Sequence, residues 1–400
     1  METEPSQTPA RDTIPRLHRI VDHVADQLVA MATGANTFEE CRIRYGETAR
    51  RLEAEGRGRV TASRVPDSQR NWSSTRDLLQ ELIRWAAVAP TPLPSARTSL
   101  DAHRDRPYEL TEKGLRLAEF AQRSRGEFTH ALADELIAAH PYFRGLLEAL
   151  DRGPIVCPVP TEGDVARGRG GPGGWAAWAS ELMGEGGDAA VIERIVREHL
   201  DRRFAGRTGE DRPSNKAIAE ALTDAFAVAS FAAHGLQVDG PTIKTLQRWS
   251  RELLLYDQSR YVPGYPSANV MWSACDLQLA GDGAPRARRR GRADHGGRVA
   301  QALIEAYRDQ AETGAGIALP VHRIRAQAAF GARVTRALAD LVLSDLIDGS
   351  YEHLGVQALA FIGSCELPDS EPAFRHRNRI RLEIQMVPLG ADISTERSTT

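Results

Sequence analysis

A run of three prolines, Pro90, Pro92 and Pro94, constrains the fold of this chain more than any other short segment. It follows a stretch whose apolar residues recur at helical spacing, namely Leu78, Leu79, Leu82, Ile83 and Trp85. Ser73, Ser74 or Thr75 stands where such a helix would be capped. Because proline clashes with the preceding helical turn, the helix must end here. The sequence then predicts a polar hairpin-like stretch over 95–106 and a short strand over 107–110.

The seven residues after this stretch carry the clearest motif: Tyr108, Glu109, Leu110, Thr111, Glu112, Lys113 and Gly114. Tyr108 and Leu110 are expected to point inward from an edge strand, and Thr111 to cap a helix over 112–122. The segment resembles the "Y-x-L-T-x-x-G" join between wing strand and closing helix of winged-helix transcription regulators. The resemblance covers about residues 65–125 and implies duplex DNA binding.

In winged-helix proteins the helix before the wing enters the major groove, and the wing contacts the minor groove or the backbone. The resemblance therefore implies candidate groove residues at Asn71, Ser73, Ser74, Arg76, Gln80 and Arg84, and candidate wing residues at Arg97, His103, Arg104 and Arg106. Arginine can pair with guanine edges or with phosphates. The alternative is a winged helix used for packing or dimerisation, with these arginines on a solvated face.

Residues 298–387 repeat this order. The predicted elements are a helix at Val299–Arg308, the stretch Ala318–Pro320, a short helix at Val321–Ala329, a longer helix at Val334–Leu346, and strands at Gln357–Ile362 and Arg379–Met386. The candidate DNA-binding residues are Arg333 and Arg336 at the longer helix and Arg375, Arg377 and Arg379 in the wing. Asp340, Asp345 and Asp348 on the same helix would neutralise part of this charge, so contact between this module and DNA stays open.

These patterns predict a mainly α fold with small β wings, in a multi-module winged-helix protein. The expected organisation is a disordered segment at 1–15, an N-terminal helical region with the winged helix at 16–125, a central helical region at 126–280, a basic linker at 281–297, a C-terminal winged-helix-like domain at 298–388, and a disordered segment at 389–400.

The central region is expected to contain two helices broken at Pro141, a glycine-rich loop at Gly153–Gly174, and further helices up to about Leu255. An ordered loop is expected at Tyr256–Met271. Tyr256, Tyr261 and Tyr265 within it form a candidate partner-binding site. The alternative is a structured connector whose tyrosines close the core beneath it.

Other function classes are disfavoured by the whole sequence. A net charge of −3 argues against histone-like coating of DNA. The four cysteines, Cys41, Cys157, Cys275 and Cys365, have no metal or redox spacing. No apolar run reaches the roughly 20 residues of a membrane span, and the N-terminus does not read as a secretory signal. We expect a cytoplasmic chain with no catalytic constellation, bound metal or cofactor.

We therefore expect non-catalytic binding of duplex DNA, together with protein partners or a homodimer and no membrane association. Two uses fit this expectation: a DNA-recognition subunit of a larger bacterial assembly, such as a phage-defence system, or a transcription regulator. The alternative from another class is a protein-interaction scaffold whose winged helices dock partner subunits without contacting DNA.

Overall fold

The structure is a computed structural model. It describes residues 19–56, 69–90, 107–205, 213–279, 285–311, 317–363, 365–368 and 371–389, with no account of the side chains of 69–71. The described chain is mainly helical, with small antiparallel sheets. It divides into two compact units, each formed from three segments of the sequence. The expected disordered ends, 1–15 and 389–400, lie outside the described residues except for Leu389.

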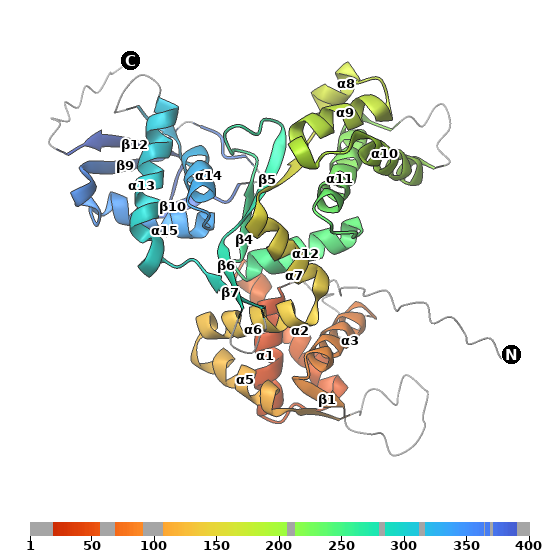
Figure 1. Ribbon diagram of the computed structural model, residues 1–400. Helices are drawn as coiled ribbons and strands as arrows, with labels where there is room; N and C mark the ends of the chain where they lie inside the picture. Colours follow the sequence, from red (N-terminus) through yellow and green to blue (C-terminus); the bar gives the residue numbers. More distant parts are fainter. Residues whose placement is uncertain are drawn as a thin grey trace. The chain divides into compact units, whose positions relative to one another are not determined.

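The first unit contains residues 1–146, 238–253 and 278–287. Its N-terminal part consists of α1 (Ile20–Ala32), α2 (Phe38–Ala54), α3 (Gln69–Arg84), β1 (Val88–Pro90), β2 (Tyr108–Leu110) and α5 (Glu112–Arg123), which we call the N-terminal module (Figure 1). The unit also contains α6 (Arg125–Ala139), the start of α7 (Pro141–Arg152), and α12 (Gly240–Glu252). Pro141 separates α6 from α7 as predicted.

A small sheet forms part of the N-terminal module. β1 and β2 are antiparallel, with Val88 opposite Leu110. On the other side of β2, Thr37 forms a β-bridge with Pro107, and Tyr108 N–H donates to Asn36 O (2.7 Å). β2 thus has partners on both sides at its start, whereas the sequence suggested an edge strand. The order of the module is helix, bridge, helix, helix, strand, strand, helix.

The second unit contains residues 147–237, 254–277 and 288–400. Its first part has β3 (Ile155–Pro158), α8 (Glu162–Arg167), α9 (Pro172–Met183), η1 (Gly184–Gly186), α10 (Ala189–Phe204), α11 (Asn215–Ala233), β4 (Tyr256–Ser259) and β5 (Ala268–Ser273). The three strands form an antiparallel sheet in the order β3-β5-β4. Helices α9, α10 and α11 share a core that includes Trp175, Ile192 and Phe226. β6 (Cys275–Leu279) and β7 (Pro285–Arg289) form a separate pair, of which Gln278–Leu279 and Pro285–Ala287 belong to the first unit.

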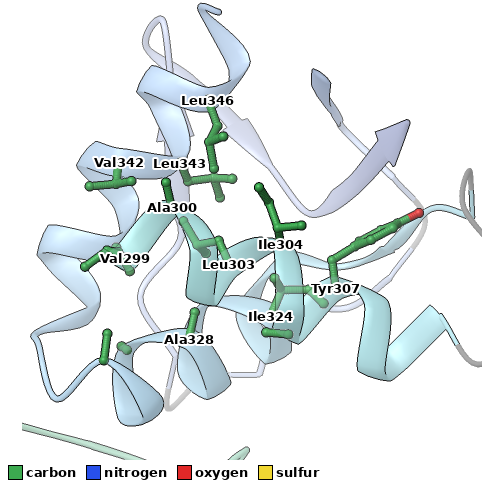
Figure 2. Packing of buried hydrophobic residues seen from close by; sticks show 14 of the residues in the cluster. Val299, Ala300, Leu303, Ile304, Tyr307, Ile324, Ala328, Val342, Leu343 and Leu346 are labelled. Carbon is green, nitrogen blue, oxygen red and sulfur yellow. The ribbon is translucent and has the colours of Figure 1, made fainter. Parts of the chain in front are cut away.

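The C-terminal module of this unit has α13 (Arg292–Ala311), β8 (Leu319–Pro320), α14 (Val321–Gly331), α15 (Arg336–Ile347), η2 (Glu352–Leu354), β9 (Val356–Phe361), β10 (Phe374–His376), β11 (Arg379–Arg381) and β12 (Glu383–Pro388). Its three-stranded sheet has the order β8-β12-β9. Figure 2 shows that apolar side chains of α13, α14 and α15 point toward one another, among them Leu303, Ile324 and Leu343, which are fully buried.

Three segments predicted as loops or linkers contain regular structure. The glycine-rich loop at 153–174 includes β3 and α8, and the tyrosine loop at 256–271 includes β4 and the start of β5. The basic linker at 281–297 includes β7 and the start of α13. Each prediction followed local glycine, proline or arginine content, whereas burial of single side chains such as Ile155, Tyr256 and Ala287 decides the outcome.

Candidate nucleic-acid interface

The helix α3 presents a polar stripe on its exposed side. Arg76, Gln80 and Arg84 are exposed and follow one another at i, i+4 and i+8, which places them along one face. The opposite face is held in the core by Leu78 and Leu82, with 1% and 0% exposure. We call Arg76, Gln80 and Arg84 the α3 stripe. The structure thus brings together three of the predicted groove residues.

The other predicted groove residues on α3 are less exposed. Ser73 and Ser74 are half-buried near the start of the helix. The backbone of Asn71 lies in α3, but its side chain is outside the described residues. The guanidinium of Arg76 is 3.4 Å from the Asp77 carboxylate, with 64% of its side chain exposed. Such a solvent-facing pair contributes little energy, so this arginine can exchange Asp77 for a phosphate.

A buried pair of side chains, Glu81 and His140, contacts Arg84 from the core side of α3. His140 Nε2 lies 2.6 Å from Glu81 Oε2, and both side chains are buried. Arg84 Nη1 is 3.3 Å from Glu81 Oε1 and 3.4 Å from His140 Nδ1. Sequence reasoning missed this pair because 59 residues separate its members. The sequence signal that could have indicated it was Glu81, a carboxylate on the buried face of α3, whose exposed face carries arginines.

The predicted join between wing strand and closing helix has a clear physical basis. Thr111 Oγ1 donates to Ala86 O (2.6 Å) and accepts from Gly114 N–H (3.1 Å), so it caps α5 and fastens it to the turn before β1. A Cβ built on Gly114 would lie 2.0 Å from Ala87 O. Only glycine permits this approach. The predicted wing residues Arg97, His103, Arg104 and Arg106 lie outside the described residues.

The C-terminal module differs at the corresponding helix, α15. Arg336 was predicted to contact DNA, but its side chain is 8% exposed and it bonds bidentately to Asp257, with Nη2 2.9 Å from Oδ1. Its Nη1 also donates to Glu371. Leaving this site would strand the buried Asp257 without its cation and leave the buried Glu371 with Arg325 alone. Arg336 is therefore a structural residue, and its assignment to the DNA interface is withdrawn.

The same buried network includes the fully buried Arg325. Its Nη1 donates to both oxygens of Asp340 (3.1 Å each), and its Nη2 lies 3.7 Å from Glu371 Oε2. Ser259 Oγ donates to Glu371 Oε1 (3.0 Å), which ties β4 into the network. Burial raises the pKa of Asp340 to about 6, against the opposing effect of Arg325. The cluster is a packed ionic core with no accessible cation.

The exposed side of α15 carries little positive charge. Ala337 and Leu341 face solvent, Leu341 with 55% exposure. The acidic residues of the helix and its C-cap are paired within the module: Asp340 with Arg325, Asp345 with Arg292 (2.8 Å), and Asp348 with Arg377 (2.8 Å). Helix α15 thus lacks the cationic stripe that α3 presents.

The wing cations of the C-terminal module lie on a tight hairpin formed by β10 and β11. Its turn residues, Arg377 and Asn378, have φ of 48° and 62°, as a two-residue turn with left-handed conformations requires. Phe374 anchors the hairpin in the core, whereas Arg375, Arg377 and Arg379 are exposed. Arg377 is held by Asp348; Arg375 and Arg379 have no ion pair with any described residue.

The remaining predicted residues serve packing. Arg333 Nη2 donates to Leu150 O and Asp151 O (3.0 and 3.1 Å), so carbonyls occupy much of its donor capacity. Tyr256 is 1% exposed and therefore unavailable to a partner. The ring of Tyr261 packs edge-on against His322, and that of Tyr265 against Phe330. Tyr261 and Tyr265 are half-buried, so a partner site at these two residues stays a prediction.

Comparison with protein-family models, curated proteins and solved structures finds no match. Within the described ranges, no three His, Cys, Asp or Glu side chains gather as a metal site would require. No helix in that part of the chain is long and apolar enough to cross a membrane.

Proposed function

We propose that this chain binds duplex DNA non-catalytically and that its N- and C-terminal modules are winged helices. Both modules begin with the order helix, β element, helix, helix and continue into antiparallel strands, which supports the second part. The α3 stripe carries the first part: two arginines and a glutamine, spaced for one groove, project from the helix before the two paired strands. These side chains can read base edges or grip phosphates.

In this proposal the C-terminal module contacts DNA with its hairpin and not with α15. Arg375 and Arg379 are free to neutralise phosphates, whereas the one arginine of α15 is buried. The sequence-reading role therefore falls to the N-terminal module, and a backbone-contacting role to the hairpin. Such a protein suits the DNA-recognition subunit of a larger bacterial assembly, including a phage-defence system, or a transcription regulator.

The test is fluorescence anisotropy with a random-sequence duplex at several salt concentrations. We compare wild type with an Arg76→Ala, Gln80→Ala double variant and with an Arg97, Arg104, Arg106 to Ala triple variant. Loss of a phosphate contact weakens binding and makes its salt dependence shallower. We expect the double variant to bind on the order of tenfold more weakly.

Arg197→Ala is the matched control. Arg197 has a similar exposure to Arg76, 59% against 64%, and a similar pairing with a neighbouring carboxylate, Glu193. It lies on α10, outside both modules. Binding should be unchanged in this variant. Equal losses of DNA affinity in Arg197→Ala and in the double variant would show that only the overall charge matters. If wild type did not bind the duplex at low salt, the proposal would be refuted.

A docking role is the second candidate for the C-terminal module. It is favoured by α15, which presents Leu341 to solvent where a DNA-reading helix presents cations. Partner binding by this surface would be insensitive to salt, since the acids around it are already paired. Pull-down at high and low salt with wild type and Leu341→Lys separates this role from DNA binding.

A further inference from the structure

The sheet of the C-terminal module has two edges with different protection. β8, at one edge, has two residues, one of them Pro320. β9, at the other edge, has six residues, and the sequence from Gly355 to Ser364 contains neither a charge nor a proline. Soluble proteins usually shorten edge strands or place lysine or proline on them, because an open edge pairs with other strands. β9 has none of these safeguards.

Pairing with β12 determines which backbone groups of β9 face outward. Leu389 N–H donates to Gly355 O (3.0 Å), and the register continues with Gln357 opposite Val387. Gly355 and every second residue after it therefore direct their backbone groups at β12. The N–H and C=O groups of Val356, Ala358 and Ala360 point the other way. No strand of the described residues pairs with that side.

We propose that β9 of a second copy of this chain pairs antiparallel with this edge, so that two three-stranded sheets become one six-stranded sheet in a homodimer. A twofold axis at Ala358 matches all three outward-facing residues of each strand. Val356 then lies opposite Ala360 of the second copy, and Ala358 opposite Ala358. Such a contact is isologous and closes at two copies.

The apolar residues at the end of β9 support this register. Phe361 and Ile362 are 39% and 65% exposed, so two neighbouring large apolar side chains face solvent at the end of β9. The twofold pairing places Phe361 opposite Gly355 of the second copy, the residue with φ of 71° at which the chain leaves η2 and enters β9. A bulky aromatic residue thus meets a residue without a side chain.

A second copy fits this edge better than an unrelated peptide. Any strand could pair with the backbone groups of this edge, whereas the identical strand also brings Gly355 opposite the bulky Phe361. The uncharged edge also lets identical strands meet without like-charge repulsion. This inference does not depend on DNA binding, since no residue of the α3 stripe takes part.

Sedimentation velocity of the full chain over a wide concentration range tests the proposal. We expect wild type to dimerise, and Ile362→Lys to weaken the dimer on the order of tenfold. Leu341→Lys is the matched control, because Leu341 lies in the same module with a similar exposure of 55% against 65%. It should dimerise like wild type. Ala360→Pro removes one outward N–H that the dimer would use, so it should weaken the dimer further. The variant should still fold, because edge strands accept proline at such positions.

Hydrogen exchange supplies a readout that does not depend on the proline variant folding. The amides of Val356, Ala358 and Ala360 should become more protected as wild-type concentration rises, and should not do so in Ile362→Lys. A monomer at every concentration would overturn the proposal. So would unchanged dimerisation of Ile362→Lys, or growth into species larger than the dimer, because a twofold contact closes.

Discussion

Helices α3 and α15 hold the same place in the order of their modules, each the third helix and each followed by strands, yet they use arginine in opposite ways. On α3, Arg76 is 64% exposed beside one weakly held carboxylate. On α15, Arg336 is 8% exposed and bonds two buried carboxylates. The presence of arginine near a candidate DNA-reading helix therefore does not by itself indicate a DNA-binding surface. Whether such an arginine is available to DNA depends on whether other segments of the chain bring carboxylates to it.

The carboxylates around Arg336 come from far away in the sequence. Asp257 belongs to β4, 79 residues earlier, and it also accepts the Arg336 backbone N–H at the start of α15 (2.6 Å). Glu371 lies 35 residues later, before the hairpin. Asp257 thus binds both the guanidinium and the N-terminus of the helix, where negative charge is favourable. The arginine that seemed suited to a groove is the centre of a joint between three segments.

The largest expected effect concerns this joint. Arg336→Ala leaves Asp257 buried without its cation and Glu371 with Arg325 alone, and should destabilise the second unit by about 3 to 5 kcal/mol. Arg76→Ala, on the exposed stripe, should change stability by less than about 0.5 kcal/mol. Urea unfolding of both variants measures the difference. Similar small effects of the two substitutions would show that the buried network is not structural and would erase the contrast between α3 and α15.

A second expected effect is a difference between the two units in how their stability depends on pH. Glu252, in the first unit, accepts the Arg19 N–H (2.9 Å) before α1, and burial raises its pKa from 4.5 to about 7. A carboxyl whose pKa is raised on folding binds more protons in the folded state. Its favourable contribution is complete below about pH 4.5 and is lost as pH rises through 7. Glu252→Gln removes this loss and should stabilise the unit at pH 8 by about 3 kcal/mol.

Unfolding followed from pH 4.5 to 8 checks this expectation, with hydrogen exchange on α1 to assign the change to the first unit. In the second unit, burial raises the pKa of Asp340 to about 6, so the corresponding loss of stability in wild type should end one unit lower. A stability curve for Glu252→Gln that runs parallel to wild type would contradict the assignment.

The sequence predicted what local patterns determine. Helical spacing located α3 and α15, and the seven-residue join correctly gave β2, the Thr111 cap and α5. Periodicity also placed Arg76, Gln80 and Arg84 on one face. These features depend on residues within a few turns of one another, and for that reason they can be predicted from a single chain.

Features that depend on distant residues could not be predicted. Nothing near Arg336 indicates that Asp257 and Glu371 will bury it, and the burial of Tyr256 follows from its position in a sheet formed by segments more than 100 residues apart. The two-residue turn at Arg377 and Asn378 was missed for a local reason, since it lacks the glycine that marks most such turns. The four predicted wing residues lie outside the described chain and stay predictions.

The smallest expected effect concerns a feature that, among the described residues, only the N-terminal module has: the closing helix α5 packed against the turn before β1. Gly114→Ala places a methyl group 2.0 Å from Ala87 O, a backbone atom whose shift would also disturb its hydrogen bond from Thr111 N–H (3.1 Å). Overpacking of this kind costs about 2 kcal/mol. Thermal unfolding of the variant should show this loss.

Gly126→Ala is the matched control, because Gly126 also lies in the first turn of a helix, α6, and its Cβ would meet only Ser124 Oγ at 3.5 Å. Alanine is the better helix former, so this variant should be stabilised by up to about 1 kcal/mol. The same substitution thus has opposite signs at two glycines twelve residues apart. If Gly114→Ala were also stabilising, α5 would not need its close approach to β1, and the glycine of the join would have no structural role. The DNA affinity of Gly114→Ala would also show whether the position of α5 affects the α3 stripe, since Ala87 directly follows the turn that ends α3.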